Sequence, residues 1–225
     1  MEKIKLEIPL QFVTLKGKLV LPANATGIIL FCSVSTSNTT KSGTKILSKL
    51  IQKRKMGTLV IPLLTKEEED VLENKFDIDL LVSRLISSTE WLMQNKNLVD
   101  LPIGYLGTKM GAAAAMRAAA YFGKDIKAVV SRSGRPDKVL DTLYQITAPT
   151  LLIVDGTDVP IINRNKIAFD QLQSEKEMKI ISISSNICTD SLKLQECAEV
   201  AISWFQKYLT MKETEPPLKT SAKTP

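Results

Sequence analysis

Polar and apolar residues alternate along the first part of the chain. Residues 4–8 and 12–21 follow the period of two that is typical of strands with one buried face. The segment at 22–26 is rich in turn-forming residues. Residues 26–33 then form a continuous apolar run, as in a strand covered on both faces of a parallel sheet. We therefore predict an antiparallel hairpin followed by a central strand.

Strand-like and helix-like segments alternate through the rest of the chain. Such alternation requires right-handed crossovers and places helices on both faces of a mostly parallel sheet. The predicted fold class is α/β, a three-layer sandwich with an N-terminal antiparallel hairpin. We expect helices at 44–55, 77–95, 111–122, 138–144, 164–172 and 192–209, and strands at 57–63, 103–106, 126–131, 150–154 and 178–183.

Polar segments mark the expected loops and the domain boundary. Residues 34–41 are almost wholly Ser, Thr and Asn, which predicts a loop, and the charge run 66–70 predicts a solvated loop or a short helical turn. The end of the chain, KETEPPLKTSAKTP, contains few apolar residues. We expect a single domain over residues 1–210 and a disordered tail over 211–225.

Composition narrows the class of protein. The 225 residues are 44% hydrophobic and 24% charged, as in ordinary globular domains. The net charge of +6 raises the question of an acidic partner, but the one dense basic run, 49–55, lies at a predicted helix end and lacks stacking aromatics. The sequence therefore contains no specific nucleic-acid motif.

The spacing of the cysteines and the hydropathy of the chain bear on the cellular compartment of the protein and on whether it binds a metal. Cys32, Cys188 and Cys197 form an odd set without metal-ligand spacing, and the chain has no histidine. No signal-peptide pattern and no apolar run of membrane-spanning length is present. We expect a soluble, cytoplasmic protein with reduced cysteines and without cofactor or metal. The sequence is compatible with a homo-oligomer but contains no feature that indicates one.

A strand-to-helix turn carries the most informative motif. The segment LPIGYLGTKMGAAAA runs from an apolar strand through Gly107-Thr108-Lys109-Met110-Gly111 into an alanine-rich helix. This is the spacing of a nucleophile elbow, in which glycines flank the central residue because the tight turn leaves no room for side chains. The alanines would let the helix pack close to the sheet.

With this motif, five stretches make the chain resemble the dienelactone-hydrolase-like branch of the α/β-hydrolases. The stretches are PLLTKEEED, KFDIDLLVSRL, LPIGYLGTKMGAAAA, AVVSRSGRPD and APTLLIVDGTDVPIINRN. They resemble in particular the hydrolase domains related to those fused to phosphoribosyltransferases. The resemblance covers residues 27–205 and implies an α/β-hydrolase fold.

The resemblance also implies where the catalytic groups of the family would fall. The nucleophile serine falls on Lys109, the acid on Asp158, and the histidine at or near Cys188. The His-Gly pair that shapes the oxyanion region falls on Ser33 and Val34. Of these features only the acid is retained.

Without histidine, the chain cannot perform Ser-His-Asp chemistry, because neither a cysteine nor a serine replaces imidazole as the base. Lys109 would act as a nucleophile or base if burial activated its amine, and otherwise would pair with Asp158 or with loop oxygens. Asp158 also has the position of a cap for the following turn. Cys188 would be a reactive thiol beside a cation, or a plain half-buried cysteine.

Two arginines follow a predicted strand in Ser131-Arg132-Ser133-Gly134-Arg135. Ligands bind at this edge of open α/β sheets, so the pair would hold a carboxylate or phosphate through fork-like hydrogen bonds. Alternatively, the arginines brace the loop against Asp137 or Asp141. With residues 33–40, this segment is expected to face the former active site, where Thr108 and Met110 flank Lys109.

Two hypotheses follow. In the first, the protein is a non-catalytic member of the fold, a pseudoenzyme with a polar pocket centred on Lys109. In the second, it is an enzyme acting on a small ester, lactone or carbonyl compound through Lys109, helped by Asp158 and Cys188. The expected ligand is in either case a small anionic or carbonyl compound.

Overall fold

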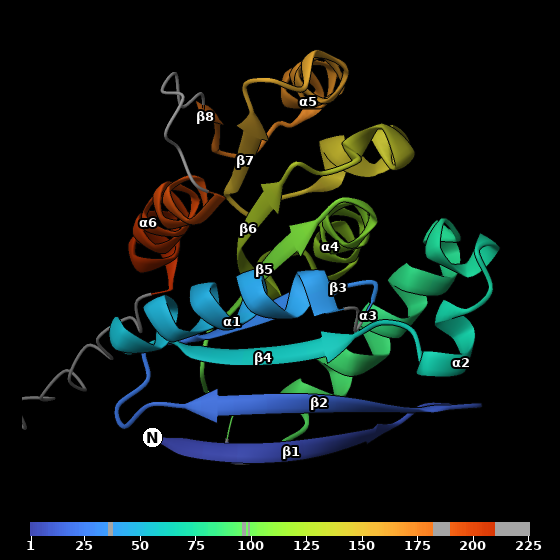
Figure 1. The fold of residues 1–225 in the computed structure, drawn as a ribbon, viewed down its shortest axis with the longest axis vertical. Helices are drawn as coiled ribbons and strands as arrows, with labels where there is room; N and C mark the ends of the chain where they lie inside the picture. The colour runs from blue at the N-terminus through green and yellow to red at the C-terminus, as the bar shows by residue number, and fades with distance from the viewer. Residues whose placement is uncertain (36–37, 96–97, 99, 182–189, 210–225) are drawn as a thin grey trace, which may run out of the picture.

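The computed structural model describes residues 1–35, 38–95, 98, 100–181 and 190–209, and its centre is one eight-stranded sheet (Figure 1). The strands lie in the order β1-β2-β4-β3-β5-β6-β7-β8. Their bounds are β1 (Glu2–Pro9), β2 (Thr14–Leu21), β3 (Ile28–Ser33), β4 (Gly57–Pro62), β5 (Ile103–Thr108), β6 (Ile126–Arg132), β7 (Thr150–Asp155) and β8 (Lys176–Ile181).

The opening hairpin and the parallel sheet are both as predicted. β1 pairs antiparallel with β2 along its whole length, from Glu2 opposite Leu21 to Pro9 opposite Thr14, and β2 is also antiparallel to β4. All later neighbours are parallel. This is the α/β-hydrolase type of sheet that the sequence led us to expect.

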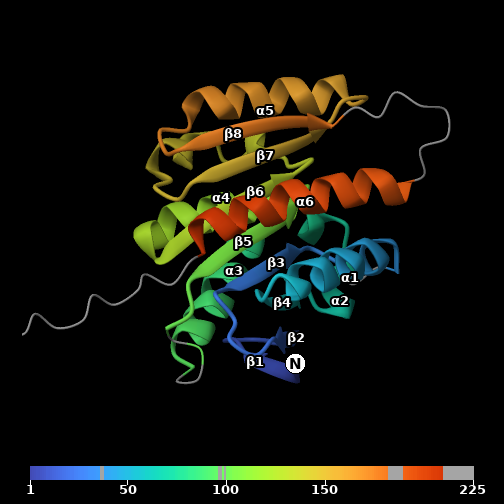
Figure 2. The same ribbon diagram turned by 90° about the vertical axis from the view of Figure 1, so that its left-hand side faces the viewer.

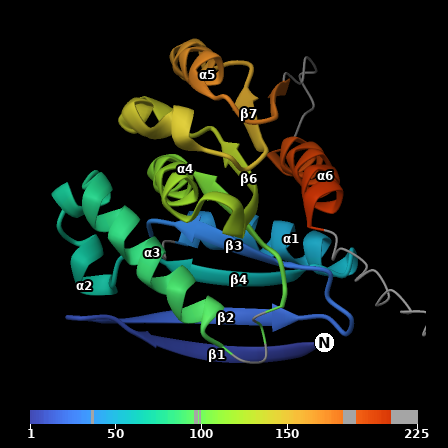
Figure 3. The same ribbon diagram turned by 180° about the vertical axis from the view of Figure 1, so that it is seen from behind.

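Helices cover both faces of the sheet. α1 (Asn38–Lys53) and α6 (Asp190–Tyr208) pack together on one face (Figure 2), and α3 (Ile78–Met93), α4 (Met110–Phe122) and α5 (Val159–Gln171) cover the other (Figure 3). The shorter helices are α2 (Lys66–Glu69), η1 (Glu73–Lys75), η2 (Gly123–Asp125), η3 (Pro136–Lys138) and η4 (Leu140–Gln145).

Each face of the sheet has its own hydrophobic core, because successive side chains of a strand point to opposite sides. Phe31, Leu106 and Val130 belong to the core beneath α1 and α6. Leu30, Tyr105 and the other members of the second core lie on the opposite face, against the alanines of α4. The central strands are therefore buried on both faces, which explains their uninterrupted apolar sequence.

Two helix starts differ from the prediction. α1 begins at Asn38, within the segment expected to be a loop, and α5 begins at Val159 instead of residue 164. In α5, Asp158 accepts a hydrogen bond from the backbone and a proline occupies the first turn, two features that favour a helix start. The short helix expected at 138–144 is present as the 3-10 helices η3 and η4.

No helix within the described residues has the length and apolar character needed to cross a lipid bilayer. The tail expected to be disordered, 211–225, lies outside the described residues.

A buried hydrogen bond between α3 and β5 provides a test of the packing. The hydroxyls of Thr89 and Tyr105 lie 2.7 Å apart, and burial raises the pKa of Tyr105. Tyr105→Phe should lower the free energy of unfolding by about 1 kcal/mol, because Thr89 keeps its bond to the Leu85 carbonyl and no buried group loses its last partner. Urea denaturation would measure this difference.

The matched control is Tyr121→Phe. Tyr121 is 64% exposed, so removing its hydroxyl should leave the unfolding midpoint unchanged. Equal effects of the two substitutions would contradict a stabilising role for the buried bond.

Candidate functional site

The carboxyl ends of β3, β5 and β6 meet at the edge of the sheet where the strand order reverses. From β3 the chain continues to β4 on one side and then to β5 on the other. In open α/β sheets, ligands bind outside the carboxyl ends of strands at such a switch point. The residues predicted from the sequence therefore belong at this edge.

The turn between β5 and α4 has the geometry of an elbow. Lys109, its central residue, has φ 50° and ψ −123°, a conformation that side-chain-bearing residues rarely adopt. A β-carbon at Gly107 would lie 2.5 Å from Cα of Ala112, and one at Gly111 would overlap the Cys32 carbonyl oxygen. The spacing recognised in the sequence is therefore required sterically.

Hydrogen bonds to one carbonyl hold the elbow. The Lys109 oxygen accepts from the backbone N–H of Ala112 at 3.2 Å and of Arg135 at 3.1 Å. Met110, the next residue, is buried in the core. The strained turn is therefore supported by α4 and by the loop after β6, which offset a cost of about 1–3 kcal/mol.

The Lys109 side chain is exposed. Within the described part of the chain it forms no hydrogen bond and no ion pair, so the expected pairing with Asp158 or with loop oxygens is absent there. Asp158 is also exposed, and its Oδ1 accepts from the Ile161 N–H at 3.0 Å. Asp158 is thus the cap of α5, the alternative that the sequence left open.

The cysteines contribute little to this edge. Burial raises the pKa of Cys32 far above its ordinary value, and burial also raises the pKa of Cys197. Cys188, at the approximate position of the family histidine, lies outside the described residues. No group of three or more Cys, Asp and Glu side chains that could hold a metal ion occurs among the residues described.

The two arginines after β6 differ in their surroundings. Arg135 donates two hydrogen bonds of 2.8 Å to the carboxylate of Asp137, and these bonds lower the pKa of Asp137. Arg135 therefore braces its own loop. Ser131 is fully buried, with its hydroxyl against Gly134, so it does not face solvent at the sheet edge.

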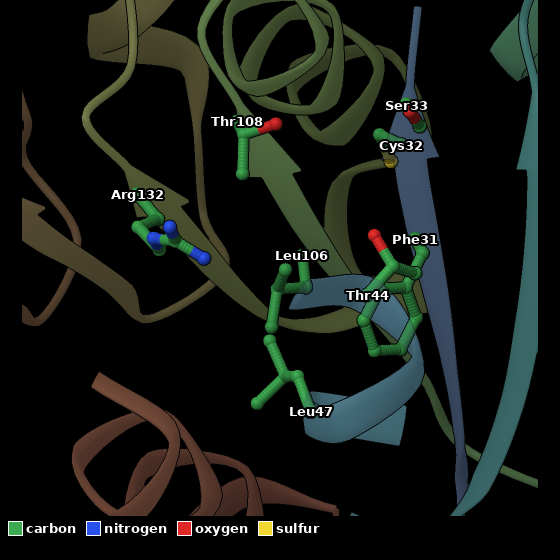
Figure 4. A pocket seen from close by; sticks show the side chains of 8 residues that line it. All are labelled: Phe31, Cys32, Ser33, Thr44, Leu47, Leu106, Thr108 and Arg132. Atoms are coloured by element: carbon green, nitrogen blue, oxygen red, sulfur yellow. The ribbon is translucent and has the colours of Figure 1, made fainter. Parts of the chain in front are cut away.

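Arg132 instead lines a small pocket on the α1 side of the sheet (Figure 4). The pocket is open in part to solvent, and its inner cavity is small, about 20 Å³. Its walls come from the ends of β3, β5 and β6 and from α1: Phe31, Cys32, Ser33, Thr44, Leu47, Leu106, Thr108 and Arg132. Lys109 is not among these residues, and Arg132 is the charged side chain among them.

Hydrogen bonds and apolar packing hold the first residues of the loop after β3. Ser33 donates a hydrogen bond to the Ser35 carbonyl, whereas Val34 packs against the core. Ser35 in turn donates to Glu69 of α2 at 3.0 Å. The charge run 66–70 forms the short helical turn α2, one of the two predicted alternatives, and Ser35 ties it to the loop after β3.

Sequence reasoning missed Thr44 and Leu47 as pocket residues. Both lie on α1, which begins at Asn38 instead of residue 44. The amphipathic spacing of α1 predicts a buried face, but it does not indicate that the helix reaches the carboxyl ends of the strands.

Comparison with known proteins assigns the family. The dienelactone hydrolase of Anabaena variabilis is 40% identical in sequence and superposes with a TM-score of 0.85, over 92% of this chain and 98% of that one. The chain belongs to the dienelactone hydrolase family. No protein-family model matches it.

Other relatives extend this comparison. Two Mycobacterium tuberculosis proteins, each named "Putative phosphoribosyl transferase", are 36% identical over 197 residues, and the chain spans 44% of their length. Est1E from Butyrivibrio proteoclasticus (TM-score 0.71, 13% identity, 90% of this chain and 99% of that one) shows the same fold. The esterase domain from a Rhodothermus marinus protein also shows this fold, with a TM-score of 0.72 and 16% identity over 93% of this chain and 100% of that one.

The steric requirement at the elbow is testable with two glycines. Gly111→Ala should destabilise the protein by about 3 kcal/mol or prevent folding, because the new methyl group would overlap the Cys32 carbonyl. Thermal unfolding followed by circular dichroism would measure the change.

Gly43→Ala is the matched control, within helix α1. Its added methyl group would meet Leu194 at an ordinary 3.8 Å, and alanine favours a helix over glycine. We expect an unchanged or slightly higher melting temperature. A Gly111→Ala protein as stable as this control would contradict the close approach of α4 to β3.

The cap function of Asp158 gives a further prediction. Asp158→Ala should lower the free energy of unfolding by about 1 kcal/mol, because the Ile161 N–H loses its acceptor. Asp158→Asn should retain most of the stability, since its amide oxygen accepts the same bond. Chemical denaturation would measure the free energies of unfolding of the wild type and the two variants. Equal stability of all three proteins would exclude a stabilising cap at Asp158.

Proposed function

We propose that this protein is a non-catalytic member of the dienelactone hydrolase family that has kept the fold as a binding module. The observation that carries the proposal is the complete absence of histidine from a chain whose elbow holds Lys109 in place of serine. The proposed ligand is a small anionic compound, bound in a polar pocket at the carboxyl edge of the sheet.

The chemistry of ester hydrolysis supports this proposal. A serine or water nucleophile needs a base that accepts its proton near neutral pH, and imidazole normally supplies it. The acid residue of a triad acts by orienting that imidazole. Asp158 has no imidazole to orient, and its carboxylate caps α5. An elbow alone cannot supply the missing proton transfer.

The alternative is an enzyme that uses Lys109 on a small ester, lactone or carbonyl compound. In its favour, Lys109 occupies the elbow and has no partner among the described side chains. However, lysines that act as nucleophiles are usually desolvated in apolar pockets or lie beside another cation. The exposed position of Lys109 supports the binding role instead.

Hydrolytic assays test the proposal directly. The purified protein should hydrolyse p-nitrophenyl acetate, p-nitrophenyl butyrate and simple lactones no faster than its Lys109→Ala variant, because no activated nucleophile is present. Absorbance at neutral pH would follow the ester reactions. Turnover by the wild-type protein that disappears in Lys109→Ala would overturn the non-catalytic assignment.

Reductive trapping tests the carbonyl version of the alternative. A reactive amine would condense with a small aldehyde, release water and form an imine, which borohydride reduces to a stable secondary amine. We expect modification at Lys109 to be no more frequent than at Lys45, an exposed lysine of α1, as measured by peptide mass spectrometry. Selective modification of Lys109 would support the alternative.

A further inference from the structure

We propose that Arg132 and the hydroxyls of Thr44 and Thr108 form a binding site for a small oxyanion, and that its preferred ligand is a monocarboxylate with a short apolar body. The three side chains come from β6, α1 and β5 and line the same pocket (Figure 4). The inference specifies which class of ligand the proposed binding module takes, and it therefore rests on the proposed function.

Arg132 is half-buried but lacks a carboxylate partner in the described part of the chain. Four of the other five arginines are paired, Arg54 with Glu199, Arg84 with Glu68, Arg117 with Asp79 and Arg135 with Asp137. The fifth, Arg164, forms no ion pair among the described residues but interacts electrostatically with Asp137. A partly desolvated guanidinium gains most from an acceptor that matches its fork of N–H groups. Figure 4 shows that the guanidinium extends from the end of β6 toward the middle of the pocket.

Two hydroxyls add donors to the same space. The side chains of Thr44 and Thr108 make no hydrogen bond with any described residue, so both can donate to a ligand. Ser33 also lines the pocket, but its hydroxyl already donates to the Ser35 carbonyl at 2.9 Å. One guanidinium and two hydroxyls therefore supply the donors for an oxyanion.

The charge of the pocket favours an anion with a single charge. Arg132 is the only charged residue among the lining side chains named above. Asp155, which ends the adjacent strand, accepts from the N–H and the hydroxyl of Thr157 at 3.0 and 2.8 Å. A carboxylate thus balances the charge of Arg132, whereas a phosphate dianion would leave a negative charge in excess.

The apolar walls determine the rest of the ligand. Phe31, Leu47 and Leu106 line the pocket together with the donors and belong to, or border on, the core beneath α1. A ligand of a few carbon atoms would place its apolar group against these side chains and its carboxylate against Arg132. The inner space of about 20 Å³ has room for little more than the carboxylate group itself, so the apolar group of the ligand would lie toward the open mouth of the pocket.

Titrations with defined anions test this site. We would titrate the 225-residue protein with butyrate, benzoate and inorganic phosphate at constant ionic strength, and measure binding by NMR shifts of backbone amides with chloride as the reference. We expect butyrate and benzoate to bind with Kd on the order of 1 mM. Arg132→Gln should weaken this binding at least tenfold, and Arg132→Lys should weaken it less, because lysine retains the charge but not the fork.

Control variants separate this site from general charge effects. Thr108→Val keeps the shape of the side chain and should weaken binding several-fold, whereas Arg54→Gln removes an equal charge beyond the far end of α1 and should have no effect. Circular dichroism would check that each variant is folded. Equal affinities of Arg132→Gln and wild type, or carboxylate binding no tighter than chloride binding, would overturn the site.

The experiment also separates the ligand class from the proposed function. Tighter binding of phosphate than of butyrate would overturn the preference for a carboxylate while retaining the oxyanion site. Anion binding lost in Arg132→Gln, in a protein with Lys109-dependent turnover, would retain the site and overturn the non-catalytic function. Failure to bind any anion, without turnover, would overturn the site alone.

Discussion

The close approach of helix α4 to strand β3 is the constraint on which the centre of the fold depends. At Gly111 a β-carbon would overlap the carbonyl oxygen of Cys32, so the first turn of α4 contacts the backbone of the neighbouring strand directly. The alanines that follow are buried in the core on the same face of the sheet. The position of α4, the direction of β5 and the sharp turn between them are consequences of that contact.

This constraint explains how the elbow persists with a lysine at its centre. The conformation of Lys109 costs about 1–3 kcal/mol, and in hydrolases such strain presents a nucleophile. Here the two flanking glycines and the hydrogen bonds to the Lys109 carbonyl impose the same turn on a residue that cannot serve as a serine. Strained geometry at this position therefore results from packing, and it is not evidence that the central side chain is catalytic.

The sequence predicted those parts of the fold that depend on local pattern. Alternation specified the hairpin, and apolar runs specified the central strands, because both patterns reflect burial directly. Helix starts were less predictable: the Ser, Thr and Asn residues before α1 favour loops and helix caps alike. At α5 the signal was present, since an aspartate precedes a proline in the first turn, and Asp158 was interpreted as a possible cap of the following turn, although the helix was expected only from residue 164.

The candidate site was less predictable from the sequence. The role of each side chain there depends on whether a carboxylate pairs with it and on which face of the sheet it lies. Arg132 and Arg135 are chemically identical and three residues apart, yet Asp137 occupies only Arg135. Strand alternation separates Ser131, which is buried against Gly134, from Arg132, which points to the α1 side. The elbow helix packs on one face of the sheet and the Arg132 pocket opens on the other. Thr108 ends β5 just before the elbow, whereas Arg132 and Thr44 come from β6 and α1, so most of the pocket donors are held by elements other than the elbow.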